Sequence, residues 1–181
     1  MTRLPGDVAI GPLAAADLVE MLALVGRCDA TYLEWAPSDW RRPDAMADIP
    51  RWRANWDRPY RSALGAFDPE RTLIAFVSWS QEVSGDERPV AGVAHVSALF
   101  VDPSRWKQGI GAALLGRAEG AMLAAGLATA RLWTPERAPA RAFYEAMGWR
   151  HDGRRDWHAP LGLEVVGYEK RLGPRPGAVT D

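Results

Sequence analysis

Twelve consecutive residues, Val90 to Val101, are almost all apolar, and they constrain the fold more than any other part of this 181-residue sequence. A run of this length and composition predicts a central β-strand that is covered on both faces. Asp102-Pro103 ends the strand, and a short basic loop leads to Gly109-Ile110-Gly111. A helix over 109–125 follows, because apolar residues recur there at helical spacing. The strand, the loop and the helix therefore form the predicted centre of the molecule.

The remaining pattern predicts strands and helices in a mixed order. Strands are expected over 8–10, 62–67, 72–80, 129–134, 149–157 and 163–172, and helices over 14–27 and 139–147. Four prolines interrupt segment 31–60, which predicts short helical pieces or turns. The order lacks the steady alternation of a doubly wound fold and indicates a single α+β domain over residues 1–172. Residues 173–181 are expected to form a disordered tail.

Composition and charge exclude several classes of function. A net charge of −1, with no basic run longer than a pair, offers no patch for nucleic acid or for an anionic membrane. The single cysteine, Cys28, excludes an intrachain disulfide and a cysteine-rich metal site, and no metal is expected. No signal-peptide stretch and no apolar run of membrane length occurs, and arginine far outnumbers lysine. We therefore expect a soluble, cytoplasmic, bacterial protein.

The loop at Gly109-Ile110-Gly111 has two interpretations. The N-terminus of a helix offers unpaired N–H groups and partial positive charge, glycine lets a phosphate approach, and Arg105 and Lys107 add charge. Alternatively, it is a glycine-rich turn that binds nothing. A dinucleotide fingerprint fits poorly, because Leu114 occupies the position of its third glycine and residues 102–108 separate strand from glycine.

Two motifs together resemble the GNAT superfamily of N-acetyltransferases. The stretch V-D-P-S-R-W-K-Q-G-I-G-A-A-L-L, residues 101–115, is similar to the acetyl-CoA signature of that family. The stretch A-R-A-F-Y-E-A-M-G-W, residues 140–149, is similar to its A-x-x-F-Y-E-x-x-G-F segment and lies one helix and one strand later, in the order of the family. The resemblance implies a mixed, mostly antiparallel central sheet flanked by helices. It also implies an acetyl-CoA-dependent N-acetyltransferase, an acyltransferase whose acceptor is a primary amine of a small molecule or peptide.

The resemblance further implies where the co-substrate acetyl-CoA binds. Main-chain amides of the loop would hold its pyrophosphate, and the end of the long strand would lie beside its pantetheine arm, with the Leu99 amide polarising the thioester carbonyl. Trp106 and Arg137 depart from the family, which usually has Gln or Arg at the first position and Asn at the second. Lys107 or Gln108 could supply the missing polar contact. The matching positions are Leu99, Phe100, Val101, Trp106, Lys107, Gln108, Gly109, Ile110, Gly111, Ala112 and Arg137.

Two residues match catalytic positions of the family. Tyr144 matches the tyrosine that protonates the departing thiolate, and the alternative is a half-buried helix tyrosine that only packs. His95 occupies the position of a glutamate base, six residues before Val101, and the alternative is a core histidine with its hydrogen bonds satisfied. No Cys–His pairing is visible, so direct transfer in a ternary complex is expected. A catalytically silent acyl-CoA-binding or regulatory domain is the alternative function.

The aromatic segment after the first helix is expected to shape the acceptor pocket. Its rings and carboxylates would suit an amine-bearing small molecule through cation–π and carboxylate contacts. Alternatively, its tryptophans fix an irregular segment to the core or form the surface of a homodimer. The candidate acceptor residues are Tyr32, Trp35 and Trp40, with Trp52, Trp56, Asp29, Glu34 and Asp39 nearby.

Overall fold

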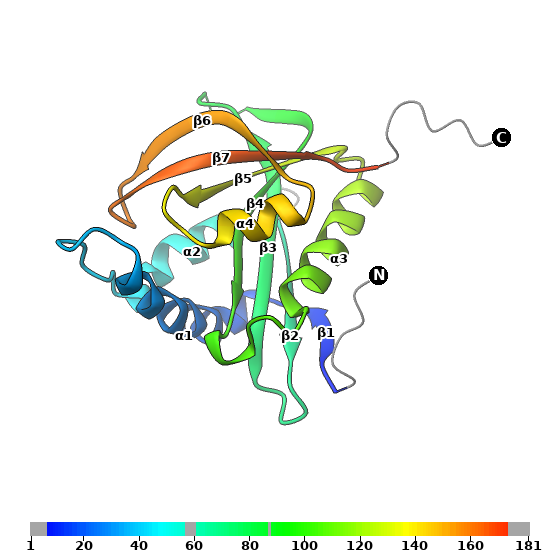
Figure 1. Cartoon of the computed structure of the whole chain (residues 1–181). Helices are drawn as coiled ribbons and strands as arrows, with labels where there is room; N and C mark the ends of the chain where they lie inside the picture. The colour runs from blue at the N-terminus through cyan, green and yellow to red at the C-terminus, as the bar shows by residue number, and fades with distance from the viewer. Residues whose placement is uncertain (1–6, 57–60, 87, 174–181) are drawn as a thin grey trace.

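The computed structural model describes residues 7–56, 61–86 and 88–173. The strands of this part form one sheet in the order β1-β2-β3-β4-β5-β7-β6, and all neighbours are antiparallel except β4 and β5 (Figure 1). This is the mixed, mostly antiparallel sheet that the resemblance implies. The strands are β1 (Ala9–Pro12), β2 (Ser62–Phe67), β3 (Leu73–Val83), β4 (Pro89–Val101), β5 (Thr129–Pro135), β6 (Arg150–His158) and β7 (Leu163–Arg171).

Helices cover both faces of the sheet (Figure 1). Side chains alternate along β3, so Phe76 packs in the core beneath α1, whereas Ala75 and Val77 pack in the core beneath α3.

No helix in the described part of the chain combines the length and apolarity needed to cross a membrane. The α-helices are α1 (Leu18–Asp29), α2 (Ile49–Trp56), α3 (Ile110–Ala124) and α4 (Ala140–Ala146). Short 3-10 helices are η1 (Ala15–Asp17), η2 (Ala30–Glu34), η3 (Ala45–Asp48) and η4 (Pro103–Arg105).

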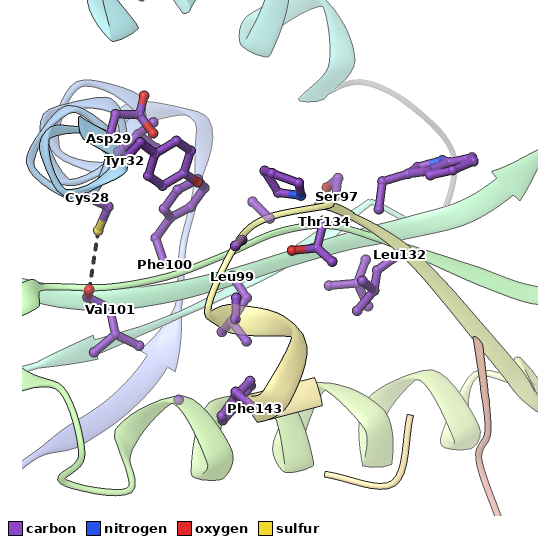
Figure 2. Close-up of a pocket in the computed structure, with 18 of the residues that line it drawn as sticks. Cys28, Asp29, Tyr32, Ser97, Leu99, Phe100, Val101, Leu132, Thr134 and Phe143 are labelled. Carbon is purple, nitrogen blue, oxygen red and sulfur yellow. Dashed lines mark hydrogen bonds between the residues drawn. The ribbon is translucent and has the colours of Figure 1, made fainter. Parts of the chain in front are cut away.

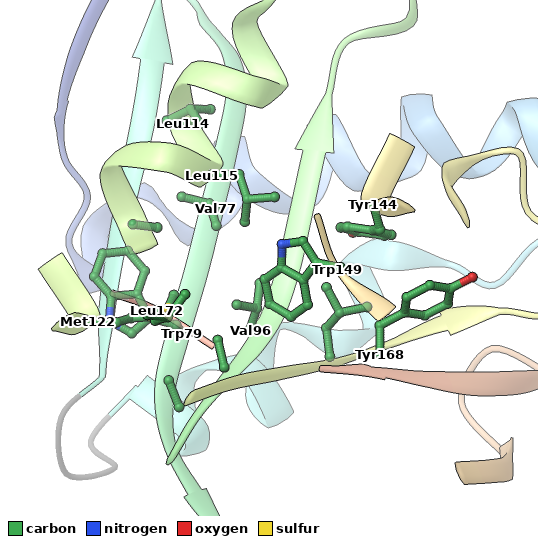
Figure 3. Close-up of a cluster of buried hydrophobic side chains, with 14 of the residues drawn as sticks. Val77, Trp79, Val96, Leu114, Leu115, Met122, Tyr144, Trp149, Tyr168 and Leu172 are labelled. Carbon is green, nitrogen blue, oxygen red and sulfur yellow. The ribbon is translucent and has the colours of Figure 1, made fainter. Parts of the chain in front are cut away.

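The apolar stripe of α3 forms the centre of the larger core. Its side chains Leu114, Leu115 and Met122 belong to one buried cluster with Val77 of β3 and Val96 of β4 (Figure 3). The predicted stripe is buried from Ile110 to Met122, and Leu115 joins it. Ala125, the last predicted member, is exposed because the helix has already ended.

Most predicted elements occur within a few residues of their expected bounds, and β2 has the predicted bounds. The prediction that the Val90–Val101 strand is covered on both faces is wrong, because Ser97 is exposed and His95 is partly exposed. The position of β7 between β5 and β6 has no local signal in the sequence. The predicted tail lies outside the described residues apart from Gly173.

Candidate active site

Strands β4 and β5 stop pairing with each other about halfway along their length. Their parallel pairing runs from Val93 opposite Thr129 to Val96 opposite Leu132. Beyond Val96, β4 continues to Val101 along β3, while β5 continues along β7. The sheet is therefore open on one side of residues 97–101.

A β-bulge at Ser97 lies at the point where the strands part. Ser78 of β3 pairs with Ala98 and Trp79 pairs with Val96, so Ser97 is an extra residue in β4. The Ser97 hydroxyl oxygen lies 3.0 Å from that of Ser78, which holds the bulge against β3. Bulges of this kind bend a strand and increase its local twist, and they are common beside active sites.

The open edge of β4 presents backbone groups to the gap. The Asp102 amide donates to the Ile74 carbonyl of β3 at 2.8 Å. Because hydrogen-bonded pairs alternate along an antiparallel ladder, Phe100 also bonds to β3, and the amides of Leu99 and Val101 point the other way, into the gap.

A cavity of about 830 Å³ fills the gap and extends to the ends of α1, α3 and α4 (Figure 2). It brings together most of the predicted site residues. Those that line it are Tyr32, Trp35, His95, Leu99, Phe100, Val101, Trp106, Lys107, Gly109, Ile110, Gly111, Ala112 and Tyr144. Gln108, Arg137 and Trp40 are not among the described residues that line it.

The loop before α3 is a cradle of backbone N–H groups. Among the described residues, no hydrogen bond involves the amides of 107–112 as donors. Lys107 and Gly109 adopt left-handed conformations, with φ of 62° and 81°, which turns the intervening amides toward one side. Such a concave arrangement at a helix N-terminus binds anions, phosphate in particular. The left-handed conformation of Lys107 is uncommon for a residue with a side chain.

The two glycines of the loop serve different purposes. Gly109 is required by its positive φ, whereas Gly111 has helical geometry. A Cβ on Gly111 would lie 3.3 Å from Val101 Cγ2 and 3.6 Å from the Phe143 ring. Gly111 therefore allows the end of β4, the start of α3 and α4 to pack closely, rather than making room for a phosphate.

The departures from the family pattern have defined positions. The indole N–H of Trp106 donates to the Val101 carbonyl at 2.7 Å, so this side chain folds back over the end of β4. The side-chain amide of Gln108 donates through Nε2 to the Ser104 carbonyl at 3.4 Å, and Arg137 is exposed. Lys107 remains the polar side chain of the loop that lines the cavity together with Arg105.

Tyr144 is buried rather than half-buried, with 8% of its surface exposed. Its ring packs between those of Trp149 and Tyr168, with centroids 6.1 and 6.2 Å away. The described part of the chain holds no hydrogen-bond partner for its hydroxyl, and burial raises the pKa of Tyr144 well above its ordinary value. The phenol is therefore neutral and able to donate a proton into the cavity.

His95 lies on the cavity wall and contacts a carboxylate from the neighbouring strand. Its Nδ1 lies 3.2 Å from Glu82 Oε2 of β3. Burial alone would raise the pKa of Glu82, but the contact with His95, with support from Arg154 and Arg131, lowers it below its ordinary value. The Glu82 carboxylate therefore lies where it can orient the His95 ring on the cavity wall.

The aromatic segment contributes to the cavity in part. Tyr32 and Trp35 line it, with ring centroids 4.5 Å apart. Trp40 is buried behind Tyr32 and donates its indole N–H to the Leu161 carbonyl at 2.8 Å. Trp52 lines the cavity and also packs against Phe76 of β3. These contacts fix the segment to the core and also form a wall of the cavity.

Cys28 is buried where α1 meets β4. Its thiol donates to the Val101 carbonyl at 3.3 Å (Figure 2). Burial, aided by Asp29 and Asp102, raises the pKa of Cys28 to about 12. The thiol is therefore protonated and a poor nucleophile at neutral pH. In the described residues no group of three or more His, Cys, Asp or Glu side chains could hold a metal ion.

Sequence reasoning missed three residues of this site. Glu82 contacts His95, Ser97 forms the bulge, and Phe143 lines the cavity beside Gly111. Phe143 belongs to the F-Y-E motif and could have been found there. Glu82 and Ser97 depend on the register of β3 against β4, which no local pattern specifies.

Comparisons with known proteins agree with this geometry. The sequence profile of the acetyltransferase (GNAT) family matches residues 29–149, about two thirds of the chain. No curated protein matches the sequence significantly.

Several solved structures share the fold. The PaiA N-acetyltransferase from Thermoplasma acidophilum, solved in complex with coenzyme A, is 23% identical with a TM-score of 0.63, over 91% of this chain and 98% of its own. The ribosomal-protein-S18-alanine N-acetyltransferase from Escherichia coli is 17% identical with a TM-score of 0.65, over 96% and 99%. An acetyltransferase from Thermus thermophilus is 17% identical with a TM-score of 0.68, over 94% and 100%.

Replacing Gly109 by alanine tests the cradle. A Cβ at this left-handed position costs about 1–2 kcal/mol, so we expect the Kd for coenzyme A to rise about fivefold to thirtyfold. Gly116→Ala on the same helix is the control, because a Cβ there meets nothing within 4 Å. Calorimetry measures both affinities, and a Gly109→Ala variant that binds like the wild type would show that the loop does not hold the ligand.

Proposed function

The chain belongs to the GNAT family of acetyltransferases, and on that premise we propose that it transfers an acetyl group from acetyl-CoA to a primary amine of a small molecule or peptide. The observation that carries this proposal is the continuous cavity. It joins a cradle of free amides at the start of α3 to an acidic, aromatic wall at the end of α1, along the open edge of β4.

The cavity fits acetyl-CoA at its α3 end. The free amides of 107–112 suit a pyrophosphate, and Arg105 and Lys107 add positive charge beside them. The amide of Leu99 would donate to an arm laid along β4 in the manner of an additional strand. When bound there, acetyl-CoA supplies an acetyl group activated as a thioester.

The Leu99 amide is the candidate electrophilic group. It points into the gap, and a donor placed there stabilises negative charge that develops on the thioester oxygen during attack by the amine. The donor is fixed by the β3–β4 ladder and by the bulge at Ser97, so little reorganisation is needed during the reaction.

Two side chains would move the protons. His95 would take a proton from the acceptor ammonium, directly or through water, with Glu82 stabilising the imidazolium that results. The amine nitrogen then attacks, the carbon–sulfur bond breaks, and Tyr144 would give its proton to the departing thiolate. Because the pKa of Tyr144 is raised, this phenol stays protonated across the pH range of an ordinary assay.

Direct transfer fits the chain better than a covalent acyl-enzyme. Cys28 is the sole cysteine of the sequence, and its thiol is buried and hydrogen-bonded to Val101. A protonated thiol cannot act as the nucleophile at neutral pH. We therefore propose that amine and acetyl-CoA are bound together when the acetyl group moves.

A panel of primary amines tests the function. With acetyl-CoA present, we expect at least one amine to release free coenzyme A thiol, measured with a chromogenic thiol reagent, and mass spectrometry to find the amine acetylated. Binding of acetyl-CoA without turnover of any amine would instead favour the catalytically silent alternative.

Tyr144→Phe tests the proposed acid. Removing the phenol proton is expected to lower kcat by about 100-fold, since general acid catalysis contributes about 10²–10⁴-fold. Acetyl-CoA affinity should hardly change. Tyr168→Phe is the control, because that hydroxyl bonds to Glu145 and Arg141 and its residue does not line the cavity. A Tyr144→Phe variant with wild-type kcat would remove Tyr144 from the mechanism.

His95→Ala tests the proposed base through the pH dependence of the rate. The wild type should lose activity as pH falls and the base becomes protonated, and His95→Ala should lose this acidic limb. The exposed His151 of β6 provides the control variant, His151→Ala. If the acidic limb of kcat/KM is unchanged in His95→Ala, then His95 serves packing alone.

A further inference from the structure

The side chain of Thr134, on β5, carries a buried hydroxyl that the fold does not use. Only 4% of the residue is exposed. Among the described residues, no hydrogen bond involves its Oγ1, yet this atom is not one of the buried polar atoms sealed from solvent without a partner. Most buried polar side-chain atoms have a partner, because leaving one unpaired destabilises the protein. Valine has nearly the same shape and would fill this place without an unpaired hydroxyl.

The Thr134 side chain faces the cavity. Thr134 belongs to the cavity wall together with Leu132 of the same strand (Figure 2). Residues two apart on a strand lie on the same face of the sheet, and Leu132 packs in the same core as Tyr144. The hydroxyl of Thr134 therefore lies on the side of the sheet that carries Tyr144, and the surface that it keeps is exposed to the cavity.

The bulge at Ser97 places Thr134 level with Leu99. The parallel ladder ends where Val96 of β4 lies opposite Leu132 of β5. Beyond that pair, Ser97 is an extra residue in β4. If this extra residue is discounted, two more residues along each strand reach Leu99 on β4 and Thr134 on β5. The two residues thus stand on opposite walls of the gap, at the same distance from its closed end.

This arrangement offers two hydrogen-bond donors to a group bound between the walls. The Leu99 amide points into the gap from β4, and the Thr134 hydroxyl, whose proton can rotate, faces the cavity from β5. A carbonyl oxygen has two lone pairs and can accept from both donors at once. The thioester oxygen of acetyl-CoA is the group of the donor substrate that gains negative charge during transfer, so a second donor there would be most useful to the reaction.

We propose that Thr134 is a further catalytic residue, whose hydroxyl donates a hydrogen bond to the thioester oxygen beside the Leu99 amide. This bond strengthens as the amine attacks and the oxygen becomes an oxyanion, and the proton stays on Thr134 throughout. The inference rests on the proposed acetyl transfer. It deepens that proposal by completing the group of donors that would stabilise the tetrahedral intermediate.

A pair of ligands that differ only at the thioester carbonyl tests the contact by binding alone. S-ethyl-CoA has a methylene group where acetyl-CoA has the carbonyl. The wild type is expected to bind acetyl-CoA more tightly, and Thr134→Val should reduce this preference about 2–10-fold, which is the usual contribution of one neutral hydrogen bond. The affinity for S-ethyl-CoA should stay the same or increase, because no buried hydroxyl is then left unpaired. Calorimetry measures all four affinities.

Turnover of an accepted amine tests the role in the reaction. Thr134→Val is expected to lower kcat about 100-fold, at the lower end of the contribution of one oxyanion donor. The loss in kcat should exceed the loss in acetyl-CoA affinity, because the bond is stronger to an oxyanion than to a neutral carbonyl. Thr134→Ser keeps the hydroxyl and should retain most of kcat together with the preference for acetyl-CoA.

Two further measurements separate this role from a structural one. Because valine removes an unpaired hydroxyl, Thr134→Val should have the same Tm as the wild type or a higher one. Thr129→Val is the matched control on the same strand. Thr129 is partly buried and is not among the described residues that line the cavity, so its variant should keep the wild-type kcat and preference.

The outcomes distinguish this inference from the proposed function. A preference for acetyl-CoA over S-ethyl-CoA that is unchanged in Thr134→Val overturns the contact, and a wild-type kcat in that variant overturns the catalytic role. A lowered Tm with an unchanged preference gives Thr134 a structural role and also overturns the inference. If no amine is acetylated, the proposed function fails, and the binding of the two ligands to the wild type and to Thr134→Val still decides whether Thr134 contacts the thioester oxygen.

Discussion

The separation of β4 from β5 after Val96 is the constraint on which the rest of the site depends. Unpaired backbone groups within a protein need partners, and here the open edge meets a cavity instead of a neighbouring strand. The Val101 carbonyl accepts hydrogen bonds from Trp106 and Cys28, whereas the Leu99 amide faces the cavity. The same opening leaves room for α4 to bring Tyr144 to the wall of the cavity.

Local sequence patterns predicted the helices and strands. The features that these patterns could not predict depend on the register between strands that are distant in the sequence. The apolar stripe of α3 and the glycine loop depend on a few neighbouring residues, so both were found from the sequence. The bulge at Ser97 and the contact between His95 and Glu82 depend on how β3 pairs with β4. The apolar run of β4 predicts a strand covered on both faces, but a strand that borders a cavity on one side, as β4 does at His95 and Ser97, has the same composition.

The site retains features that lower stability. Lys107 has a left-handed backbone conformation, and within the described residues the buried Asp29 carboxylate and the Tyr144 hydroxyl have no hydrogen bond. Each lies on one cavity, whereas the cores on the two faces of the sheet are closely packed apolar side chains. Backbone strain and buried polar groups without hydrogen bonds, when they occur together on one cavity, are characteristic of a site shaped by ligands rather than by folding.

The short parallel ladder between Val93–Val96 and Thr129–Leu132 is also the pivot about which the tip of β4 can rotate relative to β5. Residues 97–101 extend about 16 Å beyond it, so a rotation of about 5° at the ladder moves the tip of β4 by about 1.4 Å relative to β5. The width of the cleft is therefore controlled by packing around four residue pairs at its closed end. Substitutions beside these four pairs would therefore change the width of the cleft without contacting a bound molecule.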